Sequence, residues 1–125
     1  MDLKGLLPKD KHDIQAVERC ISIGFPKIIQ ILPELLTWIQ DMNWPVAKLL
    51  APFLSTIADH LETEIRTILQ GGDETWKYSL MTEIIVNSSQ LRANLNDELL
   101  RLAEKPTESE QIEKLDLIAM DILRK

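Results

Sequence analysis

Cysteine, glycine and aromatic residues are scarce in this chain of 125 residues. It has one cysteine, four glycines, three tryptophans, two phenylalanines and one tyrosine. A single cysteine cannot form an intramolecular disulfide, and Cys20 lies in an apolar pattern beside Ile21, so we expect a buried thiol in a reducing compartment. A chain of this length buries about two thirds of its unfolded surface. We therefore expect a core that needs neither disulfides nor metal.

The sequence also lacks a long apolar run. The most apolar window, residues 28–39, is interrupted by Gln30, Pro33 and Glu34 and is too short to span a bilayer. The first eight residues carry charges at positions 2 and 4 and have no apolar core, so we expect no secretory signal. We predict one cytoplasmic domain over residues 1–125 that does not associate with membranes.

Clustered basic residues are missing as well. The chain has 14 basic and 20 acidic side chains and a formal net charge of −6. Lys9 and Lys11 come closest to a basic run, and Asp10 and Asp13 offset them. Binding to a nucleic-acid backbone requires clustered Lys and Arg, so we expect no nucleic-acid partner. An acidic surface keeps a protein soluble or attracts basic protein partners.

Leucine and isoleucine dominate the apolar residues of the sequence. Leu and Ile supply 35 residues and Val supplies three, and apolar positions recur at intervals of three and four nearly everywhere. This periodicity predicts an all-α fold of about seven short helices. Start and stop signals place them near residues 10–24, 26–39, 44–57, 59–69, 74–86, 88–105 and 107–122.

Capping residues define several helix starts. We expect Asp10 to cap the first helix, Asn43 the third and Asp73 the fifth. Asp59 to Glu62 has the spacing of an acidic capping box at the start of the fourth helix, and Thr107 to Glu110 has it at the start of the seventh.

Apolar stripes and prolines complete the prediction. Pro33 is expected to kink or split the second helix near Ile31, and Pro52 to bend the third. Gly24 is expected to end the first helix. The first and last stripes are expected to face the core; they contain Ile14, Val17 and Ile21, and Ile112, Leu115, Ala119 and Ile122.

Internal similarity indicates two related helix hairpins. Residues 41–47 align with residues 73–79 at an offset of 32, and each copy has an Asp followed three positions later by a tryptophan, Trp44 or Trp76. A helix pair of this period is typical of a HEAT-type repeat. We predict a right-handed α-α superhelix of HEAT-like hairpins in which the first and last helices act as caps and the two tryptophans occupy equivalent positions.

Four motifs resemble the bacterial family catalogued as domain of unknown function 5071. They are Leu6-Leu7-Pro8-Lys9-Asp10-Lys11-His12-Asp13, Ile31-Leu32-Pro33-Glu34-Leu35-Leu36, Asp41-Met42-Asn43-Trp44-Pro45-Val46-Ala47 and Trp76-Lys77-Tyr78. They cover about residues 6–90, and the final two helices contain no motif that matches. The resemblance implies a small single-domain HEAT-like protein, and it implies no activity and no residue roles.

No constellation of catalytic or metal-ligating residues has a recognisable spacing. Cys20 and His12 are eight residues apart, but Cys20 belongs to an apolar stripe, so we interpret it as a core residue. His60 has carboxylates around it, and a helix start explains them equally well. We therefore predict no enzyme activity, no catalytic residues, no metal and no cofactor.

The function that these features favour is protein–protein interaction through a curved helical surface. We expect the second helix of each hairpin, together with the two tryptophans, to contact the partner. The candidate residues are Trp44, Trp76, Arg66, Gln70, Arg92, Asn94, Asn96 and Arg101. For both tryptophans the alternative is interior packing.

Three alternative functions stay open. An acidic compact protein suits an immunity protein that neutralises a basic toxin. A HEAT-like enzyme that processes nucleic acid is disfavoured by the charge. Self-association through an apolar end face of the last helix would give a homodimer.

Overall fold

Every regular element in the part of the chain that the structure describes is helical. The computed structural model describes residues 3–125; Met1 and Asp2, on which the expectation about a secretory signal partly rests, lie outside it. The described residues contain nine α-helices, which confirms the all-α prediction. The α-helices are α1 (Ile14–Ile23), α2 (Leu32–Leu36), α3 (Pro45–Thr56), α4 (Glu62–Leu69), α5 (Glu74–Glu83), α6 (Ser89–Asn94), α7 (Asn96–Glu104), α8 (Glu108–Ile112) and α9 (Leu115–Leu123).

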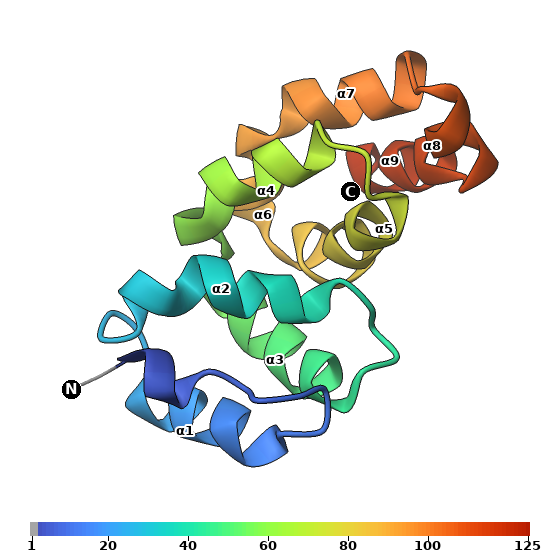
Figure 1. Ribbon diagram of the computed structural model, residues 1–125. Coiled ribbons are helices and arrows are strands. Elements are labelled where there is room, and N and C mark those ends of the chain that lie inside the picture. Colours follow the sequence, from blue (N-terminus) through green and yellow to red (C-terminus); the bar gives the residue numbers. More distant parts are fainter. Residues whose placement is uncertain (1–2) are drawn as a thin grey trace.

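The helices are stacked in chain order (Figure 1). Helix α1 contacts α3, α3 contacts α5, and α5 contacts α9, so these four helices succeed one another. Helices α2, α4 and α7 follow one another from the middle of Figure 1 to its top. The last helix, α9, packs along α7.

One continuous apolar core connects the stack from α1 to α9. Cys20 belongs to it: the side chain is fully buried, and its Sγ donates a hydrogen bond to the Leu6 carbonyl at 3.3 Å. Burial raises the pKa of this thiol, because a thiolate is poorly solvated in apolar surroundings. The prediction that Cys20 is buried is confirmed.

Local signals predict several helix ends correctly. Gly24 ends α1 with a φ of 74°, and its amide donates to the Cys20 carbonyl. The Asp73 carboxylate accepts the Trp76 amide at 3.0 Å, so it caps α5 as expected. Both halves of the capping box at Thr107 are present. The predicted split of the second helix is also confirmed, because a 3₁₀ helix ends at Ile31 and α2 begins with Pro33 in its first turn.

Three other predicted caps are wrong. Helix α1 is capped by Asp13, whose carboxylate accepts the Ala16 amide, because Asp10 is engaged with the His12 amide one turn earlier. The predicted box from Asp59 to Glu62 does not form, since Asp59 lies within a 3₁₀ helix, Ala58–Leu61, that precedes α4.

The third wrong cap concerns α3, where Trp44 and not Asn43 occupies the N-cap position. Trp44 is extended, with a ψ of 133°, because a residue before proline is disfavoured in the helical region. Pro45 follows at the first helical position as predicted, and α3 continues through Pro52.

The helices are more numerous and shorter than the seven predicted. The predicted sixth helix is interrupted at Leu95, between α6 and α7. The seventh is interrupted at Lys114, which has a left-handed φ of 61°. That turn removes Ile112 from the stripe of α9, and Ile112 is 68% exposed, contrary to prediction. Ile14, the first residue of α1, is also exposed, contrary to prediction.

The two tryptophans are not equivalent in the helices that they open. Trp44 precedes α3, whereas Trp76 is the third residue of α5. Asp73 caps its helix, whereas the Asp41 carboxylate accepts the Asn43 amide at 2.8 Å before α3 begins. The predicted equivalence is wrong because Pro45 delays the start of α3 relative to α5.

Candidate functional site

A chain of polar side chains joins α4, α5, α7 and α8 inside the C-terminal half. We call it the polar ladder. Its members are Arg66, Gln70, Glu74, Lys77, Asp97, Glu98, Arg101 and Glu110. Because it connects helices that are far apart in the sequence, it fixes the positions of α4 and α8 relative to α5 and α7.

Glu110 on α8 is the centre of the ladder. Its carboxylate accepts two hydrogen bonds from the Arg101 guanidinium, both at 3.1 Å, one from Lys77 Nζ at 2.8 Å and one from the Thr107 amide at 2.8 Å. Burial alone would raise the pKa of Glu110, but these donors outweigh it and lower the pKa from 4.5 to about 2. The carboxylate is therefore ionised at neutral pH.

Lys77 on α5 is only 1% exposed, as is Glu110. Its Nζ lies 2.8 Å from Glu110 Oε2 and 2.8 Å from Glu74 Oε1. Burial would lower the pKa of Lys77, but the hydrogen bonds that its ammonium donates to both carboxylates raise the pKa above its ordinary value. A buried ammonium is tolerated only with such partners, so the ladder keeps opposite charges paired inside the protein.

The ladder continues onto α4 through residues with more exposure. Arg66 donates to Asp97 Oδ2 at 2.8 Å and to the Asn94 carbonyl at 3.0 Å. Gln70 donates to Glu98 Oε1 at 2.7 Å. The second helices of the two predicted hairpins, α4 and α7, are therefore cross-linked side by side.

Four of the eight predicted partner-binding residues meet along this cross-link. They are Arg66, Gln70, Asn94 and Arg101. The guanidinium groups of Arg66 and Arg101 are engaged within the protein, and both side chains are half-buried. Gln70 and Asn94 are exposed.

The two tryptophans lie elsewhere and are both half-buried against the core. Trp44 packs edge-on against Trp38, with ring centroids 5.9 Å apart. Trp76 Nε1 is buried and has no hydrogen-bond partner in residues 3–125. The structure therefore does not bring the tryptophans together with the other candidates.

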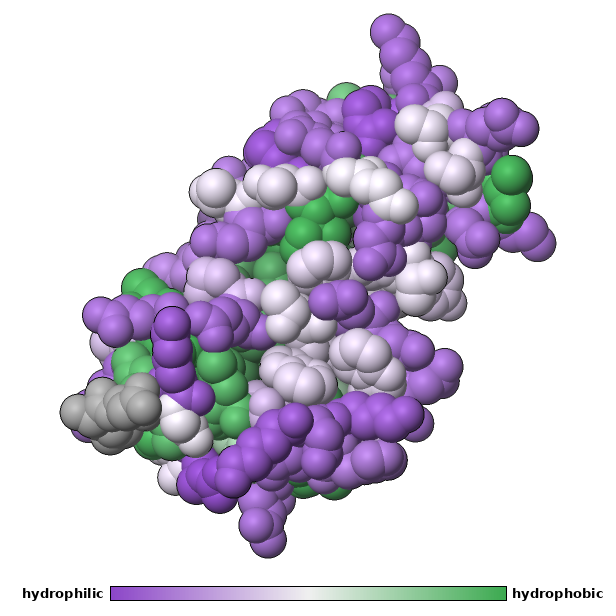
Figure 2. Space-filling model, viewed as in Figure 1, coloured by the Kyte–Doolittle hydropathy of each residue, from purple (hydrophilic) through white to green (hydrophobic). Residues whose placement is uncertain are grey.

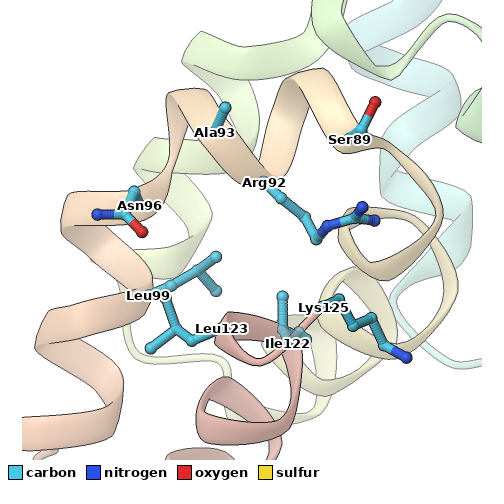
Figure 3. Close-up of a pocket in the computed structure, with 8 residues that line it drawn as sticks. All are labelled: Ser89, Arg92, Ala93, Asn96, Leu99, Ile122, Leu123 and Lys125. Atoms are coloured by element: carbon cyan, nitrogen blue, oxygen red, sulfur yellow. The ribbon is translucent and has the colours of Figure 1, made fainter.

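The remaining two predicted residues, Arg92 and Asn96, line a pocket between α6, α7 and the end of α9 (Figure 3). The pocket has a volume of about 320 Å³. Its lining consists of Ser89, Arg92, Ala93, Asn96, Leu99, Ile122, Leu123 and Lys125. We call it the α6–α9 pocket.

Charge distinguishes the α6–α9 pocket from a second, more open hollow between α5 and α8. The second hollow is lined by Asp73, Glu74 and Glu113 and by no basic residue. The α6–α9 pocket has the opposite character, since its lining includes Arg92 and Lys125 and no carboxylate side chain. In a chain of net charge −6, it offers a local site for an anionic group.

Neither arrangement has the geometry of a metal centre. Within the described residues 3–125, no group of three or more His, Cys, Asp or Glu side chains could hold an ion. His60 instead lies against the Phe25 ring, with ring centroids 4.3 Å apart. None of the helices in residues 3–125 combines the length and the apolar character that crossing a bilayer requires.

Lys77 and Glu98 were not among the residues predicted from the sequence. Glu110 was predicted only as part of a capping box, without its ion pairs. One signal could have revealed Lys77, because it shares a helix face with Leu80 and Ile84, which are buried. A lysine within an apolar stripe requires a buried carboxylate partner. The identity of that partner, 33 residues away, has no local signature.

The comparison with known proteins agrees with the motifs. The chain matches the family model described as domain of unknown function (DUF5071) over residues 6–123. The protein belongs to the DUF5071 family. The match extends beyond the resemblance over residues 6–90 and includes the helices that contribute Arg101 and Glu110.

The DUF5071 match thus covers both the polar ladder and most of the α6–α9 pocket, of which only Lys125 lies beyond it. No curated protein matches the chain. The residue roles of this DUF5071 domain must therefore come from its own geometry.

Proposed function

We propose that this protein is a non-enzymatic cytoplasmic module that binds another protein through one face of a HEAT-like, right-handed α-α superhelix. The cross-link between α4 and α7 carries the proposal. Arg66 to Asp97, Gln70 to Glu98, and Arg101 to the Leu69 carbonyl join the two helices. Helical-repeat proteins use such aligned second helices as extended binding surfaces.

The chemistry of this face supports a macromolecular partner. Gln70 and Asn94 are exposed on it and have amide groups, which both donate and accept hydrogen bonds. Figure 2 shows hydrophilic side chains along α7 at the top of the molecule and apolar side chains just below them, towards α4. A polar rim beside apolar surface is typical of protein interfaces.

Affinity capture from the native cell extract tests the proposal. The surface variant combines Gln70→Arg with Asn94→Arg, which places two large cations on the α4–α7 face. The control variant combines Gln15→Arg with Gln30→Arg, which are exposed residues outside that face. We expect the wild type and the control to retain a specific protein and the surface variant to lose it, because an interface tolerates bulky unpaired charges poorly. Identical retained proteins for all three chains would contradict the proposal, as would retention of nothing.

The outer side of α9 supports self-association as a second candidate. Leu117 is 52% exposed and Met120 is also exposed, so two apolar side chains of α9 face away from the core. If α9 forms a dimer contact, sedimentation equilibrium detects a dimer of the wild type. Leu117→Lys is expected to abolish that dimer, because burying an unpaired ammonium in an apolar contact is unfavourable. A wild-type monomer that does not change with concentration would exclude this candidate.

A further inference from the structure

The α6–α9 pocket combines an apolar side with a cationic side. Leu99 and Ile122 are buried residues of the core, and Leu123 packs against them. In Figure 3 these three side chains form one side of the pocket, and Arg92 lies across from them. An occupant that matches this lining has an apolar group and an anionic group close together.

The positive charge of Arg92 is not paired with a carboxylate of residues 3–125. One of its guanidinium nitrogens, Nη1, donates to the Val86 carbonyl, which fixes the group in position. Unlike Arg66 and Arg101, Arg92 has no carboxylate at ion-pair distance within residues 3–125. Its other donors are therefore available to a carboxylate, which a guanidinium binds with two parallel hydrogen bonds.

Lys125 adds a second cation at the rim, just after α9. The end of a helix has a partial negative charge that opposes the entry of an anion. In Figure 3 the Lys125 side chain extends away from the other lining residues, so the positive character of the pocket rests on Arg92.

We propose that the α6–α9 pocket binds the free C-terminal residue of a partner protein chain, where that residue has an apolar side chain. This inference rests on the proposed function and specifies how part of the partner is recognised. The C-terminal carboxylate would bind Arg92, and the apolar side chain would contact Leu99, Ile122 and Leu123.

Size and connectivity favour this occupant over other segments of a protein. A volume of about 320 Å³ is at the lower end for ligand pockets and holds a chain end, not a helix. A C-terminal residue has its carboxylate and its side chain on the same carbon atom. An internal Asp or Glu has a carboxylate with no apolar group beyond it, and an internal Leu has only a neutral carbonyl.

A peptide titration of the full chain tests the proposal. The probe is Gly-Ser-Gly-Ser-Leu with a free carboxylate, followed by NMR chemical-shift changes. The same peptide with an amidated end is the first comparison, and an amidated peptide that ends in Glu is the second. We expect the free-acid probe to bind at least tenfold more tightly than either amidated peptide, because only it combines the two groups.

Two variants locate the binding in this pocket. Arg92→Gln is expected to weaken the free-acid probe at least tenfold. Asn96→Asp places a carboxylate in the lining and is expected to weaken it as well, through like-charge repulsion. Gln30→Glu is the matched control, since it also converts an exposed amide into a carboxylate and Gln30 is not part of the lining, and it is expected to leave the affinity unchanged.

The remaining outcomes overturn the proposal. Equal binding of the free-acid and amidated Leu peptides would show that no carboxylate is recognised. Equal binding of the amidated Glu peptide would assign the pocket to internal acidic side chains. Absence of binding by the free-acid peptide, or equal effects of Asn96→Asp and Gln30→Glu, would also overturn it. Failure here leaves the capture experiment unaffected, because that experiment substitutes Gln70 and Asn94.

Discussion

Replacing Glu110 by alanine is expected to destabilise the protein by about 3 kcal/mol, the lower end of the cost of breaking a buried ion pair, because each of its two partners keeps one other carboxylate. Glu110 is shared by Lys77 and Arg101 and also accepts the Thr107 amide. Its removal leaves Lys77 with Glu74 and leaves Arg101 with Glu98 as remaining carboxylates. Urea unfolding followed by circular dichroism measures the loss.

Two further variants separate the charge from the side chain. Glu110→Gln keeps the length and the capping geometry at the third position of α8, since Gln also serves in a capping box. It is expected to be less destabilising than Glu110→Ala but more so than Glu104→Gln. Glu104 is an exposed residue at the end of α7, and its substitution is expected to stay within about 0.5 kcal/mol of the wild type.

A double-mutant cycle tests whether Lys77 and Glu110 interact as the structure indicates. Residues in direct contact within a charged network have coupling energies of about 0.5–3 kcal/mol. We expect Lys77→Met and Glu110→Gln together to cost less than the sum of the single changes, because each removes the partner that the other leaves unpaired. Strict additivity, or a cost of Glu110→Ala no larger than that of Glu104→Gln, would show that the ladder does not stabilise the fold.

The parts of the fold that sequence analysis predicted depend on neighbouring residues. Asp73 and the pair of Thr107 and Glu110 are caps that function within one turn of helix. Gly24 ends α1 because glycine tolerates a positive φ. Apolar spacing indicates the helix class in the same way, since it reports which face each segment buries.

The predictions are wrong where a tertiary contact or an unusual backbone conformation determines the local structure. Lys114 adopts the left-handed conformation without being Gly or Asn, so nothing in its type predicts the break that exposes Ile112. The start of α3 was predictable from Pro45, since a residue before proline favours the extended conformation. Asn43 has a side chain typical of an N-cap, but the position of Pro45 determines which residue precedes the first turn.

The candidate site was predicted only in part for the same reason. The second helices were identified from their repeat positions, and the structure joins Arg66 and Gln70 to α7. The α6–α9 pocket depends on where α9 returns along α7, and this position follows from long-range packing. Lysine side chains are usually exposed. The pairing of Lys77 with Glu110 could therefore be recognised only in three dimensions.

Acid is expected to remove much of the stability that Glu110 contributes. Its pKa is lowered from 4.5 to about 2 in the folded protein. A carboxyl group with a lowered folded-state pKa stabilises the fold fully above its unfolded pKa, and this stabilisation is lost as pH falls towards the folded value. Since a tenfold change in proton affinity corresponds to about 1.4 kcal/mol, the loss between about pH 4.5 and pH 2 is on the order of 3 kcal/mol.

The difference between two proteins isolates this contribution from the other carboxylates. The free energy of unfolding of the wild type and of Glu110→Gln is measured in urea at constant ionic strength between pH 7 and pH 2. Because glutamine does not titrate, we expect the advantage of the wild type to be constant above about pH 5 and to shrink below it. Two curves that stay parallel down to pH 2 would mean that Glu110 has an ordinary pKa, and the buried carboxylate would then not be held ionised by Arg101 and Lys77.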